Sequence, residues 1–304
     1  MGVRLGLHIP SFSYGTGVQQ LFATVVEQAR EAESAGFDAV FVMDHFYQLP
    51  MFGRPDEPML EAYTTLGALA AATETIQLGA LVTGNSYRNP TLLAKAITTL
   101  DVVSRGRAIL GMGTGWYQLE HDQLGFDFGT FTERFDKLGE ALSIIVPMIE
   151  GSRPTFSGRH YKVTDATAEP RFRERIPLLV GGSGEKKTIP LAVEHFDHFN
   201  IVAPIDMLAG KAEAVRKRCE LVGRDPGTLE TSALLTVALN DGQERGEVST
   251  DVSNRMLVGS PESIAEQIGS RVLDAGVAGV VLHVDQYRPG AITALAEALK
   301  PVLS

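Results

Sequence analysis

An acidic and an imidazole side chain stand together at the end of one apolar run in this sequence. The pair Asp44-His45 directly follows Val40-Phe-Val-Met43. Imidazole titrates near neutral pH and can both donate and accept a proton, so His45 is a candidate acid/base and Asp44 its candidate partner. A structural alternative stays open, in which Asp44 caps the following loop and His45 is a satisfied polar side chain.

Glycine-rich segments follow two other apolar runs, as Gly113-Thr-Gly-Trp116 and Gly181-Gly-Ser-Gly184. Glycine lets a backbone approach a ligand closely and exposes amide N–H groups. The second segment leads into a predicted helix over 185–195, whose N-terminus, with Lys186 and Lys187 in its first turn, could hold an anion. Together with the acid–imidazole pair, these segments predict a pocket for a flat, anionic cofactor. A solvated charged turn would leave the same pattern at 185–188.

The sequence offers little for metal or nucleophile chemistry. Glu120-His121 resembles the start of a metal site, but no second ligand set follows at a useful spacing, and no metal site is predicted. No P-loop and no serine nucleophile elbow occur. Asp101 and Arg107 flank a turn and are predicted to form a structural ion pair.

These candidate residues need elements that bring them together, and the sequence alternates short apolar runs with longer helical patterns. The predicted strands cover 3–9, 38–43, 76–82, 108–112, 177–180, 198–202, 231–239 and 279–284. The predicted helices cover 18–35, 61–74, 91–104, 131–150, 185–195, 206–222, 261–275 and 290–299. Several strands are apolar on both faces, as buried parallel strands are. Eight β-then-α repeats predict an α/β fold of the (β/α)8 TIM-barrel type rather than an open doubly wound sheet.

Active sites of such barrels lie at the C-terminal ends of the strands, where the candidate residues stand. Residues 1–304 are predicted to form a single domain with insertions at about 151–176 and 240–260 on this face. The first insertion holds a plausible small hairpin over 155–162. A pocket rim of His8, Phe12, Phe46, Met51, Phe52 and Trp116 is predicted from loop position, which favours a small apolar or aromatic substrate.

Composition limits the classes of partner. The chain has 304 residues, 44% of them hydrophobic, with one cysteine and a formal net charge of −10. A net negative chain is a poor match for nucleic acid, and no apolar run approaches the ~20 residues of a membrane helix. A single cysteine rules out an intrachain disulfide and fits a reducing compartment, so we expect a cytoplasmic protein.

The chain resembles the luciferase-like monooxygenase superfamily and, within it, the coenzyme F420-dependent oxidoreductases of actinobacteria, from about residue 3 to 240. The segments that carry the resemblance are Met43-Asp-His-Phe46, Leu78-Gly-Ala-Leu-Val-Thr83, Tyr87-Arg-Asn-Pro90, Gly113-Thr-Gly-Trp116, Gly158-Arg-His-Tyr161 and Gly181-Gly-Ser-Gly184. The resemblance implies a homodimeric enzyme that transfers a hydride between F420 and a small organic substrate. An FMN-dependent monooxygenase using oxygen is the alternative, and a binding protein without turnover is another.

The resemblance also implies roles for single residues. Asp44 and His45 would contact the deazaflavin ring, with His45 as acid/base. A non-prolyl cis peptide would back the ring at Ala80–Leu81. Thr114 and Gly115 would lie along the ring and its side chain, and Gly181, Gly182 and Ser183 would receive the phosphate. Trp116 and Leu49 replace an acidic residue and a tryptophan that the sugar-phosphate dehydrogenases of the superfamily carry, so sugar-phosphate oxidation is not expected.

Overall fold

Eight parallel strands close into a barrel in the computed structural model, which describes residues 2–15, 17–240 and 249–303. The barrel strands are β1 (Leu5–Ile9), β2 (Ala39–Val42), β3 (Gln77–Ala80), β5 (Ala108–Gly113), β8 (Leu178–Gly182), β9 (His198–Ile201), β10 (Glu230–Leu239) and β12 (Gly279–Val284). They pair in this order, and the circle closes because β12 pairs with β1. The predicted barrel fold is confirmed.

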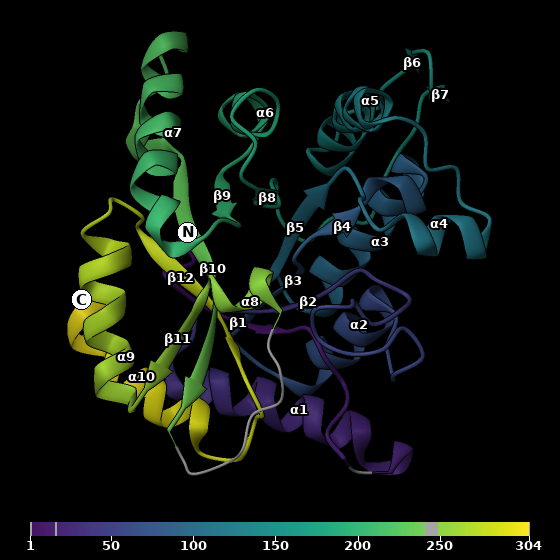
Figure 1. Ribbon diagram of the computed structural model, residues 1–304. Coiled ribbons are helices and arrows are strands. Elements are labelled where there is room, and N and C mark those ends of the chain that lie inside the picture. The colour runs from purple at the N-terminus through teal and green to yellow at the C-terminus, as the bar shows by residue number, and fades with distance from the viewer. Residues whose placement is uncertain (1, 16, 241–248, 304) are drawn as a thin grey trace.

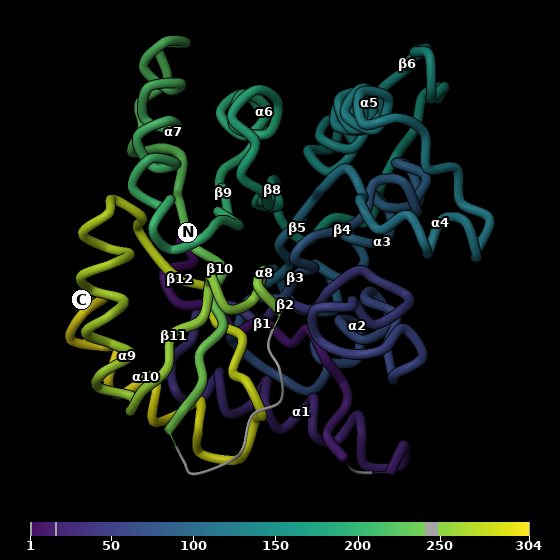
Figure 2. The backbone as a smooth tube through the Cα atoms, in the orientation of Figure 1, coloured from purple at the N-terminus to yellow at the C-terminus, as the bar shows by residue number. Residues whose placement is uncertain are grey.

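Helices surround the barrel and follow its strands along the chain (Figure 1). They are α1 (Val18–Ala35), α2 (Ala62–Ala72), α3 (Pro90–Val103), α5 (Phe131–Ile149), α6 (Thr188–His195), α7 (Leu208–Val222), α9 (Pro261–Ile268) and α10 (Ala291–Leu303). The purple α1 and the yellow α10 lie side by side at the bottom of Figure 2, and their contacts complete the ring. One predicted start is wrong: α6 begins at Thr188, so Lys186 and Lys187 precede the helix.

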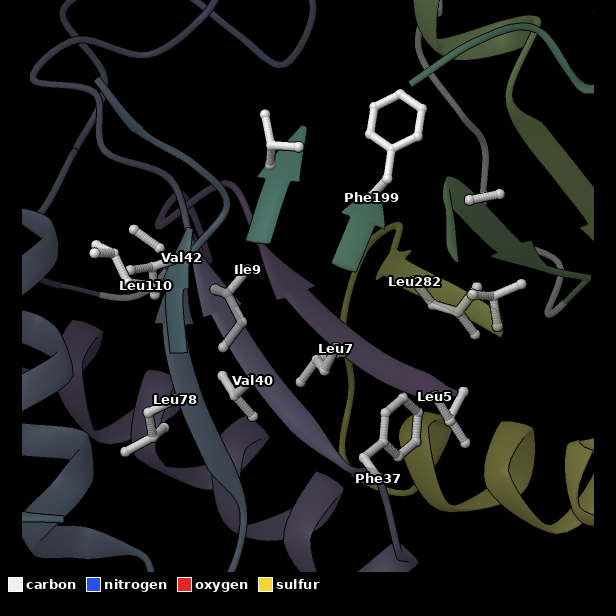
Figure 3. Close-up of a cluster of buried hydrophobic side chains, with 14 of the residues drawn as sticks. Leu5, Leu7, Ile9, Phe37, Val40, Val42, Leu78, Leu110, Phe199 and Leu282 are labelled. Atoms are coloured by element: carbon white, nitrogen blue, oxygen red, sulfur yellow. The ribbon is translucent and has the colours of Figure 1, made fainter. Parts of the chain in front are cut away.

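Alternating side chains divide the core into two layers. On β1, Leu5, Leu7 and Ile9 join the large cluster between the strands and the helices, and Figure 3 shows them with neighbouring members of that cluster. Phe41 of β2 instead belongs to a smaller cluster inside the barrel. The period of two residues in a strand produces both layers, which explains why the strands are apolar on both faces. His8, between Leu7 and Ile9, therefore faces the barrel interior.

Shorter elements decorate the strand ends. They are β4 (Thr83–Gly84), α4 (Gln118–Leu124), the antiparallel pair β6 (Phe156–Ser157) and β7 (Lys162–Val163), α8 (Thr250–Ser253) and β11 (Met256–Gly259), with short 3-10 or π turns at Asn85–Tyr87, Ile205–Met207, Pro226–Thr228 and Gly269–Leu273. The predicted hairpin at 155–162 is confirmed by β6 and β7. Of the predicted insertion at 240–260, residues 241–248 lie outside the described residues, and the remainder contains α8 and β11.

The long strand β10 has two different neighbours along one edge. Its first part, Glu230 to Ala233, pairs with β9, and its last part, Thr236 to Leu239, pairs with β11. The strand β11 therefore takes the place of β9 at the C-terminal end of the barrel. Because α8 immediately precedes β11, this pairing brings α8 to the barrel mouth.

The predicted ion pair between Asp101 and Arg107 is wrong. Asp101 pairs with Arg173 at 2.8 Å, whereas Arg107 donates to Thr73 and to backbone carbonyls of Ala70, Thr73, Ile76 and Ser104. The buried guanidinium of Arg107 is satisfied by carbonyls and joins the end of α2 to the start of β3, whereas Asp101 stabilises a different contact.

No helix within the described ranges is long and apolar enough to cross a membrane.

Candidate active site

A cavity of about 440 Å³ opens at the C-terminal ends of the barrel strands, within the size range of small-molecule sites. Its lining residues are His8, Met43, Asp44, His45, Leu49, Met51, Phe52, Leu81, Val82, Thr83, Gly84, Tyr87, Gly113, Thr114, Gly115, Trp116, Gly181, Gly182, Val202, Ala203, Pro204, Leu234, Asp251, Asn254 and Arg255. Most of the residues predicted for the site are among them.

Four predicted residues do not line the cavity. Phe12 is only 1% exposed and packs in the core between strands and helices. Phe46 turns away from the cavity to stack on Phe126, with ring centroids 5.6 Å apart. Ala80 faces the helices because it alternates with Leu81, and Ser183 lies beyond the part of β8 that reaches the cavity. A loop position alone does not fix the direction of a side chain, which is why Phe12 and Phe46 were misplaced.

The imidazole of His45 is held by a carboxylate from a distant part of the chain. Its Nδ1 lies 2.8 Å from Oε2 of Glu120, and its ring meets Trp116 edge-on with centroids 5.7 Å apart. An ionised carboxylate can only accept, so Nδ1 carries the hydrogen of this bond. In neutral His45 the lone pair therefore resides on Nε2. His45 thus has one nitrogen fixed by the protein and the other available to a ligand.

Glu120 is fully buried and accepts hydrogen bonds on both oxygens. Oε1 accepts from the backbone amides of Phe46 (2.5 Å) and Tyr47 (2.9 Å), and Oε2 accepts from the Tyr87 hydroxyl as well as from His45. Burial opposes ionisation, but the bonds from His45, Tyr87 and Tyr47 outweigh it and hold the pKa of Glu120 below its ordinary value. Burial and the Glu120 carboxylate together raise the pKa of the Tyr87 phenol. Glu120 is therefore an anion that orients the loop carrying His45.

Asp44 has a different partner from the one predicted. Its carboxylate accepts from Arg88 Nε at 3.0 Å and Nη2 at 2.5 Å, and from the amide of Gly84 at 3.1 Å. Arg88 also donates to Glu61 at 2.7 Å and lies over the ring of Tyr63. Burial opposes ionisation of Glu61, but Arg88 and the helix amides lower the pKa of Glu61 to about 2. Asp44 thus joins β2 to the segment after β3, and its oxygens are occupied by this buried ion pair.

The wall of the cavity opposite α8 is a bulged segment between β3 and β4. A non-prolyl cis peptide lies at Leu81–Val82, one residue beyond the predicted Ala80–Leu81 position. This segment passes so close to β5 that a Cβ atom on Gly111 would collide with the carbonyl oxygen of Ala80, and one on Gly113 would lie 2.7 Å from Val82. The glycines of β5 therefore make room for the bulge, in addition to any approach of a ligand.

Polar groups gather on the other wall, where the sequence predicted only an apolar rim. His8 is 4% exposed, and both of its ring nitrogens lack a hydrogen-bond partner. Burial and the nearby positive charges lower the pKa of His8 to about 3. His283 lies beside His8 on β12 but lines a neighbouring cavity, and its pKa is lowered to about 4 mainly by burial. Arg255 completes this wall at the start of β11.

The Glu120-His121 pair was weighed in the sequence as the start of a metal site. No group of three or more histidine, cysteine, aspartate or glutamate side chains in the described part of the chain could hold a metal ion. The Glu120-His121 pair has other partners, because His121 bonds the Tyr87 loop through Ser86 at 2.8 Å.

Comparison with known proteins places this site in a family. The model of the family described as luciferase-like monooxygenase matches residues 3–248. This chain belongs to that family. It is 39% identical over 158 residues to an F420-dependent glucose-6-phosphate dehydrogenase of Microbacterium testaceum, which covers 52% of this chain and 46% of that protein. The chain spans about half the length of this relative.

Two further comparisons extend over more of this luciferase-like chain. A protein of the same name from Nakamurella multipartita is 31% identical over 244 residues, covering 79% of this chain and 70% of its own. Among solved structures, an F420-dependent secondary alcohol dehydrogenase in complex with an F420-acetone adduct has a TM-score of 0.84 at 20% identity, with both chains covered completely. At that identity the second likeness shows the fold alone.

Sequence reasoning missed three groups of this luciferase-like site. Glu120 was weighed only as a metal ligand. Its place in the first turn of α4, soon after the glycine-rich end of β5, is the signal that it could reach the cavity and orient a side chain there. Arg88 was quoted only as part of a motif. Arg255 gave no signal, because nothing in the sequence indicates that β11 replaces β9 beside β10.

Proposed function

We propose that this chain is an F420-dependent oxidoreductase that transfers a hydride between the deazaflavin and a small organic substrate. The F420-dependent names of its relatives support the cofactor. The observation that carries the proposal is His45, an imidazole at the cavity wall whose Nδ1 is fixed by a buried carboxylate. A reaction that moves a hydride and a proton needs one such group beside the substrate.

The cavity fits a flat ring. Leu81 and Val82 present apolar surface on one wall. Gly113 of β5 and Gly181 and Gly182 of β8 also line the cavity, and without side chains they leave room for a ring beside that wall. Gly182, with φ of 147°, turns the chain at the end of β8 so that backbone amides can face an anion. We expect Thr114, Gly115, Gly181, Gly182 and Ser183 to hold the cofactor's side chain and phosphate. When bound, F420 would supply a ring carbon that accepts or gives a hydride.

The residues of this chain would then handle the proton and the geometry. In its doubly protonated form His45 would give the Nε2 proton to the substrate during reduction, and in its neutral form it would take a proton at Nε2 during oxidation, while Nδ1 stays protonated beside Glu120. Arg88 and Glu61 would hold Asp44, and through Gly84 the bulged wall, in one position. Leu49, Met51, Phe52 and Trp116 would exclude water from the mouth. Binding and orientation then supply most of the rate enhancement.

Sugar phosphates are a poor match for this mouth. The sugar-phosphate enzymes of the superfamily carry an acidic residue at the position of Trp116 and a tryptophan at the position of Leu49. Both Trp116 and Leu49 line the cavity of this chain. We therefore propose an enone, imine, quinone or ketone with an apolar body as the substrate class, although the two relatives compared above are named for glucose 6-phosphate.

Titration with F420 and, separately, FMN tests the proposal. Trp116 is the only tryptophan and lies at the cavity, so quenching of its fluorescence reports binding directly. Tight binding of F420 with weak binding of FMN supports the reductase, and the reduced cofactor is then used to screen candidate substrates. The reverse preference overturns it in favour of an oxygen-using monooxygenase. Binding of F420 without turnover of any substrate would favour a carrier protein.

Assembly and location remain part of the proposal. We propose a homodimer in the cytoplasm, as for the family the sequence resembles. Light scattering coupled to size-exclusion chromatography measures the assembly, and a mass near that of one 32.8 kDa chain would contradict it.

A further inference from the structure

Arg255 is held at the cavity by its backbone. Its carbonyl oxygen accepts from the amide of Thr236 on β10 at 2.9 Å, and its amide donates to Val252 at 2.9 Å. The preceding residue, Asn254, accepts from the amide of Ile205 at 3.0 Å. The guanidinium therefore extends from backbone that is bonded to β10 and to the turn after β9, so its reach into the cavity is limited by the barrel.

The guanidinium of Arg255 has N–H donors that no protein group in the described ranges accepts. In the described ranges it makes one hydrogen bond, from Nε to the backbone oxygen of Asp251 at 3.2 Å, and no ion pair. Among the described residues that line the cavity, Arg255 is the only arginine or lysine. Arg88 lies behind the lining residue Asp44 and is bound by the carboxylates of Asp44 and Glu61. Burial lowers the pKa of Arg255, with a smaller opposing effect from Asp251. Within the described ranges its two terminal nitrogens have no protein partner, so they are available to a ligand in the cavity.

The buried His8 and the half-buried His283 lie side by side next to this wall, and His8 lines the cavity. In the parallel register of β1 and β12, Leu7 lies beside Leu282, so His8 and His283 are neighbours on the inner face. His283 pairs in turn with Thr236, whose amide holds Arg255. Both nitrogens of His8 are buried without a partner although His8 lines the cavity. Uncharged imidazole can donate from one nitrogen, so this wall offers a cation and an adjacent neutral donor.

We propose that Arg255 and His8 recognise a carboxylate on the substrate. This inference rests on the proposed function, because it names the substrate class of the same cavity. A guanidinium binds a carboxylate through two parallel hydrogen bonds, and one cation balances one carboxylate charge. A phosphate dianion would call for a second cation, whereas the further charged group at this wall is Asp251. The substrate is then an apolar body that carries one carboxylate, rather than a wholly apolar molecule.

Benzoate and its uncharged analogue benzamide are probes that separate this idea from simple apolar binding. Both are titrated into cofactor-free and F420-loaded protein while Trp116 fluorescence is followed. We expect benzoate to bind the unmodified chain more tightly than benzamide. Arg255→Met should raise the Kd of benzoate at least about tenfold and leave that of benzamide within about twofold. Arg255→Lys, which keeps the charge but not the fork, should fall between.

Arg54→Met is the matched control, because Arg54 is an exposed cation near the mouth that pairs with Asp56 and does not line the cavity. Equal binding of benzoate and benzamide by the unmodified chain overturns the proposal, as does an Arg255→Met chain that keeps the preference. A raised Kd for F420 with unchanged benzoate binding assigns Arg255 to the acidic tail of the cofactor instead. Failure of F420 to bind at all ends the proposed function, but the comparison in cofactor-free protein can still be read.

Discussion

Replacing Glu120 by glutamine tests the hydrogen bond that orients His45. Glutamine can still accept from the amides of Phe46 and Tyr47, but its uncharged amide no longer holds Nδ1 of His45. We expect kcat to fall about 10- to 100-fold, as for other orienting carboxylates, with the Kd of F420 within a few fold. The pH–rate profile should also change shape, which a purely structural defect would not produce.

Glu140→Gln is the control for that measurement. Glu140 also accepts three backbone amides, from Arg159, His160 and Tyr161 at 2.7 to 3.0 Å, but it does not line the cavity. Its variant should lose stability without losing kcat. If both variants lose kcat equally, Glu120 has no specific role in orienting His45.

His45→Ala removes the proposed proton donor itself. We expect the Kd of F420 to stay within a few fold, because the cofactor is held mainly by backbone groups, while turnover falls by about 10² or more. Added imidazole should restore part of the rate. His195→Ala, at the exposed end of α6, serves as the control. Equal activity of the His45 variant and the unmodified chain would remove His45 from the mechanism.

Two histidines with lowered pKa values make stability depend on pH. The pKa of His8 is lowered to about 3 and that of His283 to about 4, so below an ordinary value of 6.5 the unfolded chain binds protons that the folded chain does not. The free energy of unfolding should therefore fall as the pH drops from about 6.5 to 5, by up to about 1.4 kcal/mol per pH unit for each histidine.

His8→Leu removes one of these two contributions. Urea titrations at several pH values should show a smaller loss of stability between about pH 6.5 and 5 than in the unmodified chain. A control with His195→Gln should keep the original dependence. An unchanged slope in the His8 variant would mean that His8 is protonated in the folded protein.

At the scale of elements, the fit of β3 against β5 depends on glycine. Gly111→Ala would drive a Cβ atom into the Ala80 carbonyl, so we expect the free energy of unfolding to fall by about 3 kcal/mol or more. Gly139→Ala, in the middle of α5 with open space around its Cβ, should instead raise it by up to about 1 kcal/mol. Urea midpoints measure both. Equal effects would mean that β5 can shift away from β3.

The elements that the sequence predicts well are those with long, regular patterns. All eight barrel strands follow from apolar runs, and α1 from a helical period ended by Gly36, whose φ is 89°. The two-residue strand β4 and the four-residue β11 are too short to leave a period. The start of α6 was misplaced because a charged turn and a first helical turn have the same composition.

The pairings across the chain were beyond the sequence for a different reason. His45 and Glu120 are 75 residues apart, and Asp44 and Arg88 are 44 apart. Barrel closure places these residues at the same mouth, but which carboxylate meets which partner depends on loop paths. The sequence therefore predicted that His45 lies at the strand-end cavity, but not that Glu120 is its partner.

At the scale of the whole molecule, cofactor binding should stabilise the barrel. The cavity is lined by residues from β1 through β11, so a bound ligand touches elements that separate on unfolding. At a concentration 100 times its Kd, F420 should raise the free energy of unfolding by about 2.7 kcal/mol. Thermal scans with F420 and with FMN measure this. No rise in melting temperature with F420 would contradict the assignment of this cavity.

The prediction that residues 1–304 form one domain is also testable at this scale. The sheet joins β1 to β12, and α1 packs on α10, so the described ends of the chain share one layer. We propose that unfolding is a single cooperative transition. Two separate transitions by fluorescence and circular dichroism would contradict a single domain.

The replacement of β9 by β11 beside β10 separates two tasks in the architecture. The wall expected to face the cofactor is built by β3, β4, β5 and β8, whereas Asp251, Asn254 and Arg255 all belong to one short stretch outside the β/α repeat. Substitutions in that stretch therefore leave the backbone of the strands proposed to hold the cofactor unchanged, so the two ends of the cavity can be altered independently.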